Sequence, residues 1–571
     1  MHDLRALLIT GLMGSAAFSL AAQASSLAGD EERDFLADSP AAGTSPDKAA
    51  ADEVPSDEQL EASGARIGEI RIETKQIFNL DDPKENNWLF RTVDRLHVPT
   101  HPSTIRAQLV FHSGDLYLRS RLDESARNMR QNSNFLREPE IRPVRYHDGL
   151  VDILVVVHDV WTVQPSASFG RSGGKNTASV ALTDDNFLGY GKFVEVGHSE
   201  NVDRSSSYAI WTDPNVWGSH WQDTFQYQNN TDGRVWNVGG SLPFYALETP
   251  YAGGGSTGNS KSVVTRYSLG NPFDAYAFDY RVTDLYFGQA PFISDMWTGR
   301  VLVGFRHDDS VFAPAVPPNL PLLAPLPADR NLSYPYVRTQ WVQNDFVTTR
   351  NLDQIAFTED LHFGLDVSLG LGYSAPAFDA DRKSFIADSE ISYNTQLDAR
   401  NVLFFSSRLY SRFEYGRMDD AIATGSASWF LTTSERSKLF VHVSGDAGHN
   451  LDLDHSLEIG GDTGLRGYPL RYQNGDDRVQ ATVEERLYTN WFLFRLVHVG
   501  GAAFFDMGRT WGTTAVPTPQ LGLLKDIGAG LRLGNARSAY GSIIHIDLAT
   551  PLDARGSISK LQFLVSTQQT Y

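Results

Sequence analysis

Apolar and polar residues alternate along most of this chain, from Val163 to its end. The alternating runs are about ten residues long, and clusters of Gly, Asn, Asp and Pro separate them. One such run divides into an apolar face and a polar face: Val479, Ala481, Val483 and Leu487 against Gln480, Thr482, Glu484 and Arg486. Because a period of two residues is that of a β-strand, the pattern predicts an all-β region over residues 161–571.

The polar faces and the strand ends favour a transmembrane β-barrel over a soluble all-β protein, which would also alternate and stays the alternative. The polar face repeatedly carries charge, while aromatic residues such as Trp491 and Trp511 gather near strand ends. If each strand and its connection take about 25 residues, roughly 410 residues predict about 16 antiparallel strands. A direct count of the alternating runs gives roughly 20, so some of these runs are expected to be long loops or continuations of strands. The proline-rich stretch Phe312–Asp329 is predicted to be a loop, because proline cannot donate to a sheet.

Residues 65–160 have a different pattern, which predicts one small α/β module. The expected order is β-α-α-β-β, with elements at Ile67–Ile72, after Pro102, from Leu122, at Ile141–Tyr146 and at Val151–Val157. An exposed edge of this sheet can accept an added strand from a partner.

The N-terminal region is predicted to contain an export signal and a linker. Arg5, the apolar stretch Ala6–Leu20 and the small residues of Ala22–Ala24 are typical of a signal peptide over residues 1–24. An anchor helix is the alternative, although about 15 apolar residues are few for crossing a bilayer. Residues 25–64 contain 11 acidic and two basic residues, which predicts a disordered linker or an acidic arm that binds a partner.

Composition narrows the classes of function. The chain has no cysteine, which excludes disulfides, thiol catalysis and cysteine-bound metals. Its net charge of −20 argues against nucleic acid as the main partner. Its 15 histidines show neither HExxH nor paired metal-ligand spacing, so no metal or cofactor is predicted. Together with the export signal, the alternation predicts a barrel in a bacterial outer membrane.

The sequence pattern GxSxG occurs twice, at Gly170–Gly174 and at Gly254–Gly258. A nucleophile elbow needs a strand before the serine and a helix after it. Both matches are expected in glycine-rich hairpin connections with no helix following, so no catalytic residue is predicted. A lipid hydrolase embedded in the barrel is therefore only a third candidate function.

The segment Leu457–Tyr472 contains the most specific motif of the chain. Leu465-Arg466-Gly467-Tyr468 resembles the V-R-G-F/Y tip of the long inward-folded loop in the BamA/TamA outer-membrane assembly superfamily. The family places this tip inside the barrel, against acidic residues of the following strands, and Glu484 and Asp506 match those positions. Because a guanidinium can hold one or two carboxylates in bidentate geometry, Arg466 is predicted to fix the loop in the lumen.

The small module carries a second resemblance. Leu109–Asp115 resembles the L-x-F-x-x-G-D stretch between the helices of POTRA domains, and Asn134–Leu136 and Asp152–Ile153 also fit. The resemblance implies a periplasmic POTRA domain at residues 65–160, followed by the barrel. The family's assembly protein carries more POTRA modules than the one expected here, and no patatin-like hydrolase domain, as in some single-module relatives, is expected in the residues before it. The essential insertase role is therefore not carried over directly.

A barrel closes where its first strand pairs with its last. The first strand is expected at Val163–Gly170 and contains Pro165, which has no N–H to donate. The last strand is expected at Leu561–Tyr571, and its polar end at Ser566–Gln569 has little outward apolar surface. The pattern predicts a weakly paired seam that opens sideways, or a proline that merely marks the periplasmic start of the strand. The expected seam residues are Pro165, Phe169, Phe563 and Tyr571.

These observations predict a barrel that assists the insertion or translocation of other polypeptides at the outer membrane. Its expected partners are outer-membrane lipid, unfolded or extended outer-membrane polypeptides, and a periplasmic partner that binds the POTRA domain. The alternative is a passive pore or surface antigen that has the fold without the assembly activity.

Overall fold

The computed structural model describes residues 54–75, 77, 88, 91, 95, 97–132, 135–316, 319–350, 358–434, 436–493, 497–516, 518–535, 543–553 and 558–568. The predicted signal peptide, the linker up to residue 53, Asn134 and Tyr571 lie outside these residues.

The small domain, residues 54–160, is a three-stranded sheet covered by helices α5 (Pro102–Arg106) and α6 (Arg119–Asn132). Its strands are β1 (Arg66–Lys75), β2 (Leu136–His147) and β3 (Leu150–Asp159), in the order β1-β3-β2. Strand β1 is parallel to β3, and β2 is antiparallel to it. Helix α6 turns Leu122, Ala126 and Met129 into the core of this domain. Among the described residues, no helix is long and apolar enough to cross a membrane.

The ordered part of the small domain begins before residue 65, which corrects the expected end of the linker. Residues Asp57–Ala62 form helix α3, which Ser56 caps by accepting a hydrogen bond from the Gln59 backbone N–H. Leu60 is fully buried in the core, and burial of such a side chain provides about 2 kcal/mol. This apolar contact fixes the last residues of the acidic segment to the domain.

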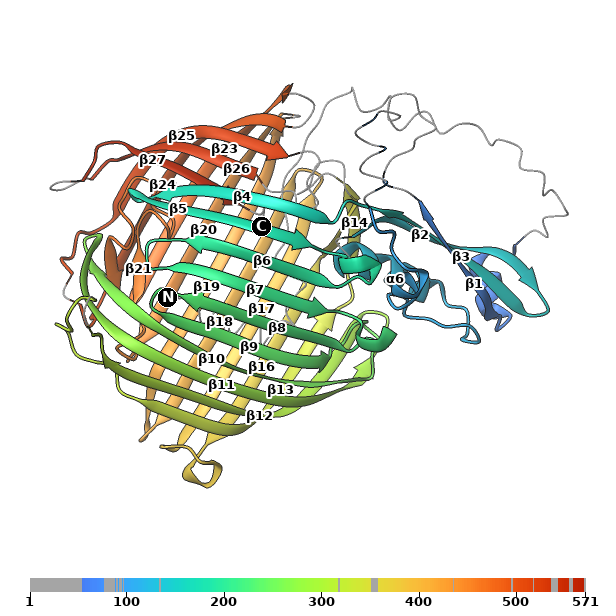
Figure 1. Ribbon diagram of the computed structural model, residues 1–571, viewed down its shortest axis with the longest axis horizontal. Helices are drawn as coiled ribbons and strands as arrows, with labels where there is room; N and C mark the ends of the chain where they lie inside the picture. The colour runs from blue at the N-terminus through green and yellow to red at the C-terminus, as the bar shows by residue number, and fades with distance from the viewer. Residues whose placement is uncertain are drawn as a thin grey trace.

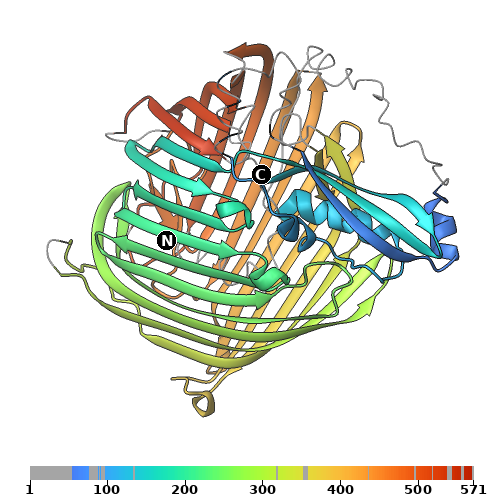
Figure 2. The same cartoon turned by 45° about the vertical axis from the view of Figure 1, so that its right-hand side comes forward.

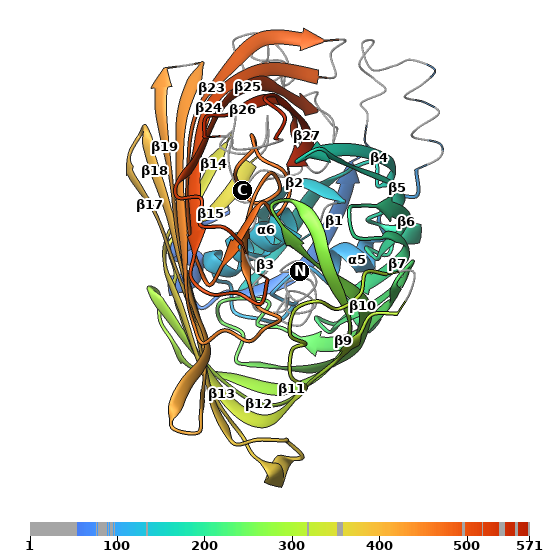
Figure 3. The ribbon, with the colours of Figure 1, turned by 90° about the vertical axis from the view of Figure 1, so that its left-hand side faces the viewer.

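The remaining chain forms a closed barrel of 20 antiparallel strands (Figures 1 and 3). Its strands are β4 (Val163–Ser172), β5 (Lys175–Asp184), β6 (Phe193–Glu200), β7 (Ser205–Asp213), β8 (Gln222–Asn230), β9 (Gly233–Leu242), β10 (Tyr251–Ser268), β11 (Asn271–Ile293), β12 (Trp297–Pro314), β13 (Arg330–Gln343), β16 (Gly364–Ser374), β17 (Ser384–Asp398), β18 (Asn401–Glu414), β19 (Arg417–Ser434), β20 (Ser437–His449), β23 (Asp477–Leu493), β24 (Val497–Trp511), β25 (Leu524–Asn535), β26 (Ile543–Pro551) and β27 (Gln562–Gln568). Two hairpins lie outside the barrel sheet: β14 (Phe346–Arg350) with β15 (Thr358–His362), and β21 (Leu457–Ile459) with β22 (Gln473–Gly475). Three short 3-10 helices are η2 (Phe187–Gly189), η3 (Val216–Gly218) and η4 (Pro376–Phe378).

The expected number of about 16 strands is wrong, because the connections are shorter than the estimate assumes. Gly173 and Gly174 alone join β4 to β5, and Tyr415 and Gly416 alone join β18 to β19. Both turns contain residues with positive φ, which allows such tight reversals. The same number of residues therefore holds more strands.

The outer surface of the barrel is apolar. Large apolar side chains alternate outward along the strands, among them Val180, Leu182, Phe225, Leu285, Phe287, Val303, Leu369, Leu371, Leu409, Leu531 and Leu548. On β23 the polarity divides as expected, since Val483 and Leu487 are exposed while Glu484 and Arg486 are buried inside. An apolar exterior around a polar interior is the arrangement of a barrel that faces lipid.

We call the end of the barrel that faces the small domain the proximal end, and the opposite end the distal end (Figure 2). The proline-rich stretch lies at the distal end. Its first three residues, Phe312–Pro314, still belong to β12, and the described residues from Ala315 to Asp329 form the expected loop. The buried pair Arg266–Asp274 fixes this loop, because Asp274 accepts hydrogen bonds from the backbone N–H groups of Leu323 and Ala324 at 2.9 and 2.7 Å.

If the exterior faces lipid, replacing Leu285 by Arg destabilises the folded barrel by about 2–4 kcal/mol. Leu285 is 57% exposed in the middle of β11. The measurement is the urea midpoint of the heat-modifiable form in lipid vesicles. The matched control is Tyr415→Arg, at a turn residue that is 84% exposed, which we expect to change stability by less than about 0.5 kcal/mol. Equal midpoints for the two variants would favour a soluble barrel.

Candidate functional site

The loop between β20 and β23, residues 450–476, folds into the barrel, and we call it the inner loop. The hairpin of β21 and β22 forms its stem, and Arg466 lies near its tip. Ile459, Leu465 and Tyr468 are fully buried and pack with Leu524 of the barrel wall. The apolar side chains of the loop therefore hold it against the wall formed by the C-terminal strands.

Arg466 binds the two carboxylates that the sequence predicts. Its Nε and Nη2 donate to Asp506 Oδ2 and Oδ1 at 2.7 and 2.9 Å, and its Nη1 donates to Glu484 Oε2 at 2.7 Å. The guanidinium carbon also lies 3.3 Å from the centre of the Phe504 ring. Two carboxylates and an aromatic face thus surround a guanidinium that points from the loop to the wall.

The site includes an acid that sequence reasoning missed. Asp547 of β26 lies 3.4 Å from Arg466 Nη1 and also binds Arg532. The alternation of β26 could have placed Asp547 on the inner face, because Ile544 and Leu548 point outward while Asp547 is buried inside. Only the register of β26 against β25 places Asp547 beside the loop tip.

Charge is nearly balanced around the loop tip. Arg486 and Arg532 both bind Glu484, at 2.9 and 3.0 Å. Asp526 is a further buried carboxyl on this wall, across the ladder from Asp506. Three guanidiniums therefore face four carboxyl groups: Arg466, Arg486 and Arg532 against Glu484, Asp506, Asp526 and Asp547.

The other tip residues position Arg466. A Cβ on Gly467 would lie 2.5 Å from the Asp526 Cβ, so the tip approaches the wall too closely for a side chain at this position. Tyr468 donates its hydroxyl to the Lys525 carbonyl at 3.0 Å. All four residues of the motif Leu465–Tyr468 thus contact the wall formed by β23 to β26.

Among the described residues, the seam between β27 and β4 has the fewest paired residues of any strand pair in the barrel sheet. Val565 pairs with Arg171 across it, whereas β4 and β5 share ten pairs. If this antiparallel register is continued, Phe169 faces Thr567 and Phe563 faces Gly173. The predicted seam residues Phe169 and Phe563 therefore lie on the two seam strands without facing each other.

Pro165 lies inside β4, opposite Leu182 of β5. It lies on the proximal side of the single seam pair, so its missing N–H falls in the part of β4 that has no partner from β27 among the described residues.

Two proximal turns repeat the same structure and hold the small domain. The turns Thr183–Gly189 and Thr212–Gly218 share the pattern T-D-x-N-x-x-G. In each turn the Asp carboxylate accepts a hydrogen bond from the Asn backbone N–H at 3.0 Å. Each turn also contains one exposed non-glycine residue with positive φ, Leu188 or Trp217. Two Asx turns at equivalent positions therefore form a repeated rim.

The two asparagines of this rim bind the segment around α5. Asn186 donates from Nδ2 to the Thr100 hydroxyl at 2.8 Å, and Asn215 accepts a hydrogen bond from the Gln108 side chain. Gly189 accepts hydrogen bonds from the His101 backbone N–H and the Thr104 hydroxyl. Side-chain amides and backbone groups thus dock one edge of the small domain to the barrel.

Helix α6 docks on the third turn, residues 243–250. Glu124 accepts a hydrogen bond from the Leu247 backbone N–H at 2.7 Å, and Asn128 donates to the Tyr245 carbonyl at 2.9 Å. Burial raises the pKa of Glu124, although the Leu247 N–H and Arg127 oppose this shift. Arg127 also lies 4.2 Å from the Phe346 ring of the β14–β15 hairpin.

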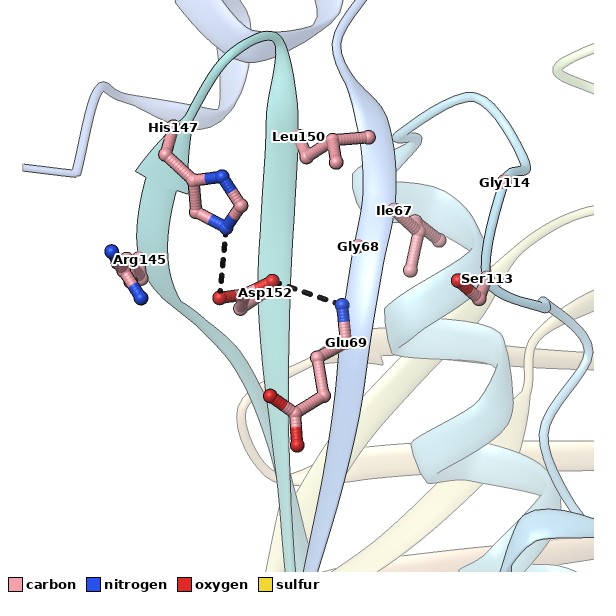
Figure 4. Close-up of a pocket in the computed structure, with 9 residues that line it drawn as sticks. All are labelled: Ile67, Gly68, Glu69, Ser113, Gly114, Arg145, His147, Leu150 and Asp152. Atoms are coloured by element: carbon pink, nitrogen blue, oxygen red, sulfur yellow. Dashed lines mark hydrogen bonds and ion pairs between the residues drawn. The ribbon is translucent and has the colours of Figure 1, made fainter.

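A pocket of about 380 Å³ lies at the outer end of the small domain (Figure 4). Asp152 there accepts a hydrogen bond from the Glu69 backbone N–H at 2.9 Å and lies 3.2 Å from His147 Nε2. A Cβ on Gly68 would lie 2.4 Å from Asp152, so the irregular β1–β3 pairing requires glycine. Asp152 therefore stabilises this bulge through its hydrogen bond to the backbone, and we assign no chemistry to the pocket.

One cluster of side chains has the spacing of metal ligands: Asp420, Asp452 and His455. Arg412 and Arg330 already contact Asp452 of this cluster, at 2.8 and 3.2 Å. These contacts favour an ion-pair network over a metal.

Of the two GxSxG matches, Gly170–Gly174 spans the turn between β4 and β5. Gly254–Gly258 lies inside β10 rather than in a hairpin connection, which corrects its expected place. Strands flank both serines, and a nucleophile elbow requires a helix after the serine.

No protein-family model matches this chain, and no curated protein matches it. Among solved structures, it is similar to CdiB from Acinetobacter baumannii, with 14% identity and a TM-score of 0.45 over 88% of this chain and 73% of that chain. It is also similar to BamA from Haemophilus ducreyi lacking POTRA domains 1–3, with 14% identity and a TM-score of 0.39 over 87% and 85%. CdiB from Escherichia coli has 12% identity and a TM-score of 0.44 over 88% and 76%.

Replacing Arg466 by Ala leaves the buried Asp506 carboxylate without its arginine and removes one of the three arginines that bind Glu484, which costs about 3–5 kcal/mol. We expect less heat-modifiable barrel in the membrane and a lower urea midpoint. The matched control is Arg408→Ala, which breaks an exposed ion pair with Glu390 and should cost about 0–1 kcal/mol. Wild-type amounts of folded Arg466→Ala protein would show that the loop tip does not stabilise the barrel.

Proposed function

We propose that this chain is an outer-membrane barrel of the BamA/TamA superfamily that assists the insertion or translocation of other polypeptides. The observation that carries the proposal is the seam, where the described parts of β27 and β4 are joined by a single pair, Val565 with Arg171, in an otherwise continuous sheet.

The seam offers backbone hydrogen-bonding groups to an incoming strand. Among the described residues, β27 pairs only with the distal end of β4, and the segment from Val163 to Gly170 is paired on its β5 side alone. Unpaired N–H and C=O groups in a lipid environment cost several kcal/mol each. An extended segment of another polypeptide that pairs with this edge removes that cost, so the edge favours strand addition.

The small domain is proposed to be a single POTRA domain in the periplasm. Strand β1 is an edge of its sheet, and beyond Ile70 the pairs recorded for β1 lie on its β3 side. The other edge strand, β2, contains Pro143 and two register shifts, which make it a poor template. Strand β1 is therefore the proposed site for capturing an extended client segment.

The docking rim supports a link between capture and the seam. The turns that hold α5 belong to β5 through β8, the strands next to β4. A client segment bound to the small domain would thus be held on the side of the barrel where the seam lies. A passive pore is less well supported, because the inner loop occupies the lumen and binds both sides of it.

Locking the seam tests lateral opening directly. Cysteines in place of Arg171 and Val565 face each other in an antiparallel pair, at a Cα separation of about 5 Å that suits a disulfide. The chain has no other cysteine. We expect the oxidised double variant to lose client insertion and dithiothreitol to restore it. The control pair Phe169→Cys with Phe563→Cys is out of register and should not cross-link. Full activity of the oxidised, verified disulfide would contradict lateral opening.

A quantitative comparison of outer-membrane proteins with and without this gene tests the activity itself. We expect selective loss of one or a few barrel or surface proteins, which would be the clients, and recovery when the gene is restored. Restoring it with the locked seam variant should give no recovery. An unchanged outer-membrane proteome would favour the passive pore or surface antigen, and conductance in planar bilayers would then separate those two.

A further inference from the structure

The inner loop contacts the barrel on both sides of the seam. Its tip, Leu465–Tyr468, binds strands β23 to β26, which end the barrel. The residues just before and after the tip contact the turns of β4 to β7, which begin it. The loop therefore joins the two walls that meet at the single seam pair.

The contacts with the first strands are specific. The Ser172 hydroxyl, at the distal end of β4, donates to the Gly461 carbonyl. A Cβ on Gly173 would lie 2.2 Å from the Leu470 nitrogen, so the loop backbone packs directly on the β4–β5 turn. Gly173 has a positive φ of 53°, and both features favour glycine at this position.

An ion pair adds to these contacts. Arg471 Nη1 and Nη2 donate to Asp203 Oδ1 and Oδ2 at 2.9 and 2.6 Å, and Asp203 lies in the distal turn between β6 and β7. The Arg471 guanidinium carbon also lies 4.7 Å from the Tyr267 ring. A bidentate pair of this kind is geometrically demanding, so it fixes the distance between the loop and the wall.

The loop holds the two walls unequally. On the side of the C-terminal strands, apolar side chains and Arg466 fill the interface. On the other side, a cavity of about 480 Å³ separates the loop from the wall of β6 to β11, and Asp203, Arg471 and Glu458 lie at its edge. The first wall is thus packed continuously against the loop, while the second touches the loop at its distal turns, on either side of the cavity.

We propose that Arg471, Asp203 and the Ser172–Gly461 contact form a clasp that holds the seam closed from inside the barrel. Releasing the clasp frees β4 to β7 to move away from β27, while Arg466 keeps the loop on the other wall. This inference extends the proposed function and rests on its lateral seam. Because a single backbone pair joins the described parts of β27 and β4, the sheet itself holds these two strands together only weakly, and the clasp determines whether the seam is open or closed.

The distance across the seam tests the clasp. Because the chain has no cysteine, spin labels can be placed at Lys175→Cys and Ser559→Cys, two exposed distal positions on opposite sides of the seam. Distances are measured by double electron–electron resonance on the full chain in lipid nanodiscs. We expect one narrow distribution for the wild type. In Arg471→Ala we expect a population longer by at least one strand spacing, about 5 Å.

Two further variants make the result decisive. Asp203→Asn keeps the volume of the side chain and removes the charge, so it reports on the clasp if Arg471→Ala does not fold. Arg338→Ala is the control, because it breaks a lumen-wall pair with Asp388 at 2.9 Å that does not include the inner loop. Identical distributions in the wild type and in folded clasp variants would overturn the clasp.

The outcome is independent of client insertion. A longer distance in the clasp variants, together with an unchanged outer-membrane proteome in the gene deletion, would leave the clasp standing and contradict the proposed function. Loss of clients in the deletion, with no change of distance in the clasp variants, would support the proposed function and contradict the clasp.

Discussion

The burial of the Arg466 guanidinium is the interaction on which the barrel interior depends. Moving a cation out of water costs several kcal/mol, and the carboxylates of Glu484, Asp506 and Asp547 offset that cost only at short range. Those three acids come from β23, β24 and β26, so the ion network forms only when these strands are in register. The position of the loop and the register of the last strands therefore depend on each other.

A closed sheet of 20 strands leaves a lumen too wide for side chains to fill, and chain segments fill it instead. Two segments are held by a buried arginine–aspartate pair. Arg466 of the inner loop binds Asp506 of the wall, whereas Arg266 and Asp274 both belong to the wall and bind the backbone of the proline-rich loop. The fork of a guanidinium matches a carboxylate in two hydrogen bonds, which gives each loop one orientation.

The two ends of the molecule are held by different mixtures of contacts. At the proximal end, Asn186 and Asn215 dock the small domain with neutral hydrogen bonds, and the Glu124 carboxylate accepts one from the Leu247 N–H. At the distal end, ion pairs such as Arg471 with Asp203 join the inner loop to the strands. Screening by salt weakens partly exposed ion pairs more than neutral hydrogen bonds. The distal ion pairs near the seam are consequently more responsive to ionic conditions than the asparagine contacts of the proximal rim.

The sequence by itself determined the local features of this protein. A period of two residues predicts an all-β region and the inward face of a strand such as β23, and the motif Leu465–Tyr468 predicts the contacts of Arg466 with Glu484 and Asp506. Only the tertiary structure decided the number of strands, the place of Asp547, the pairing of Asp203 with Arg471, and the register that separates Phe169 from Phe563. Alternation gives the face of a residue without its neighbour, because the offset between strands arises when the whole sheet closes.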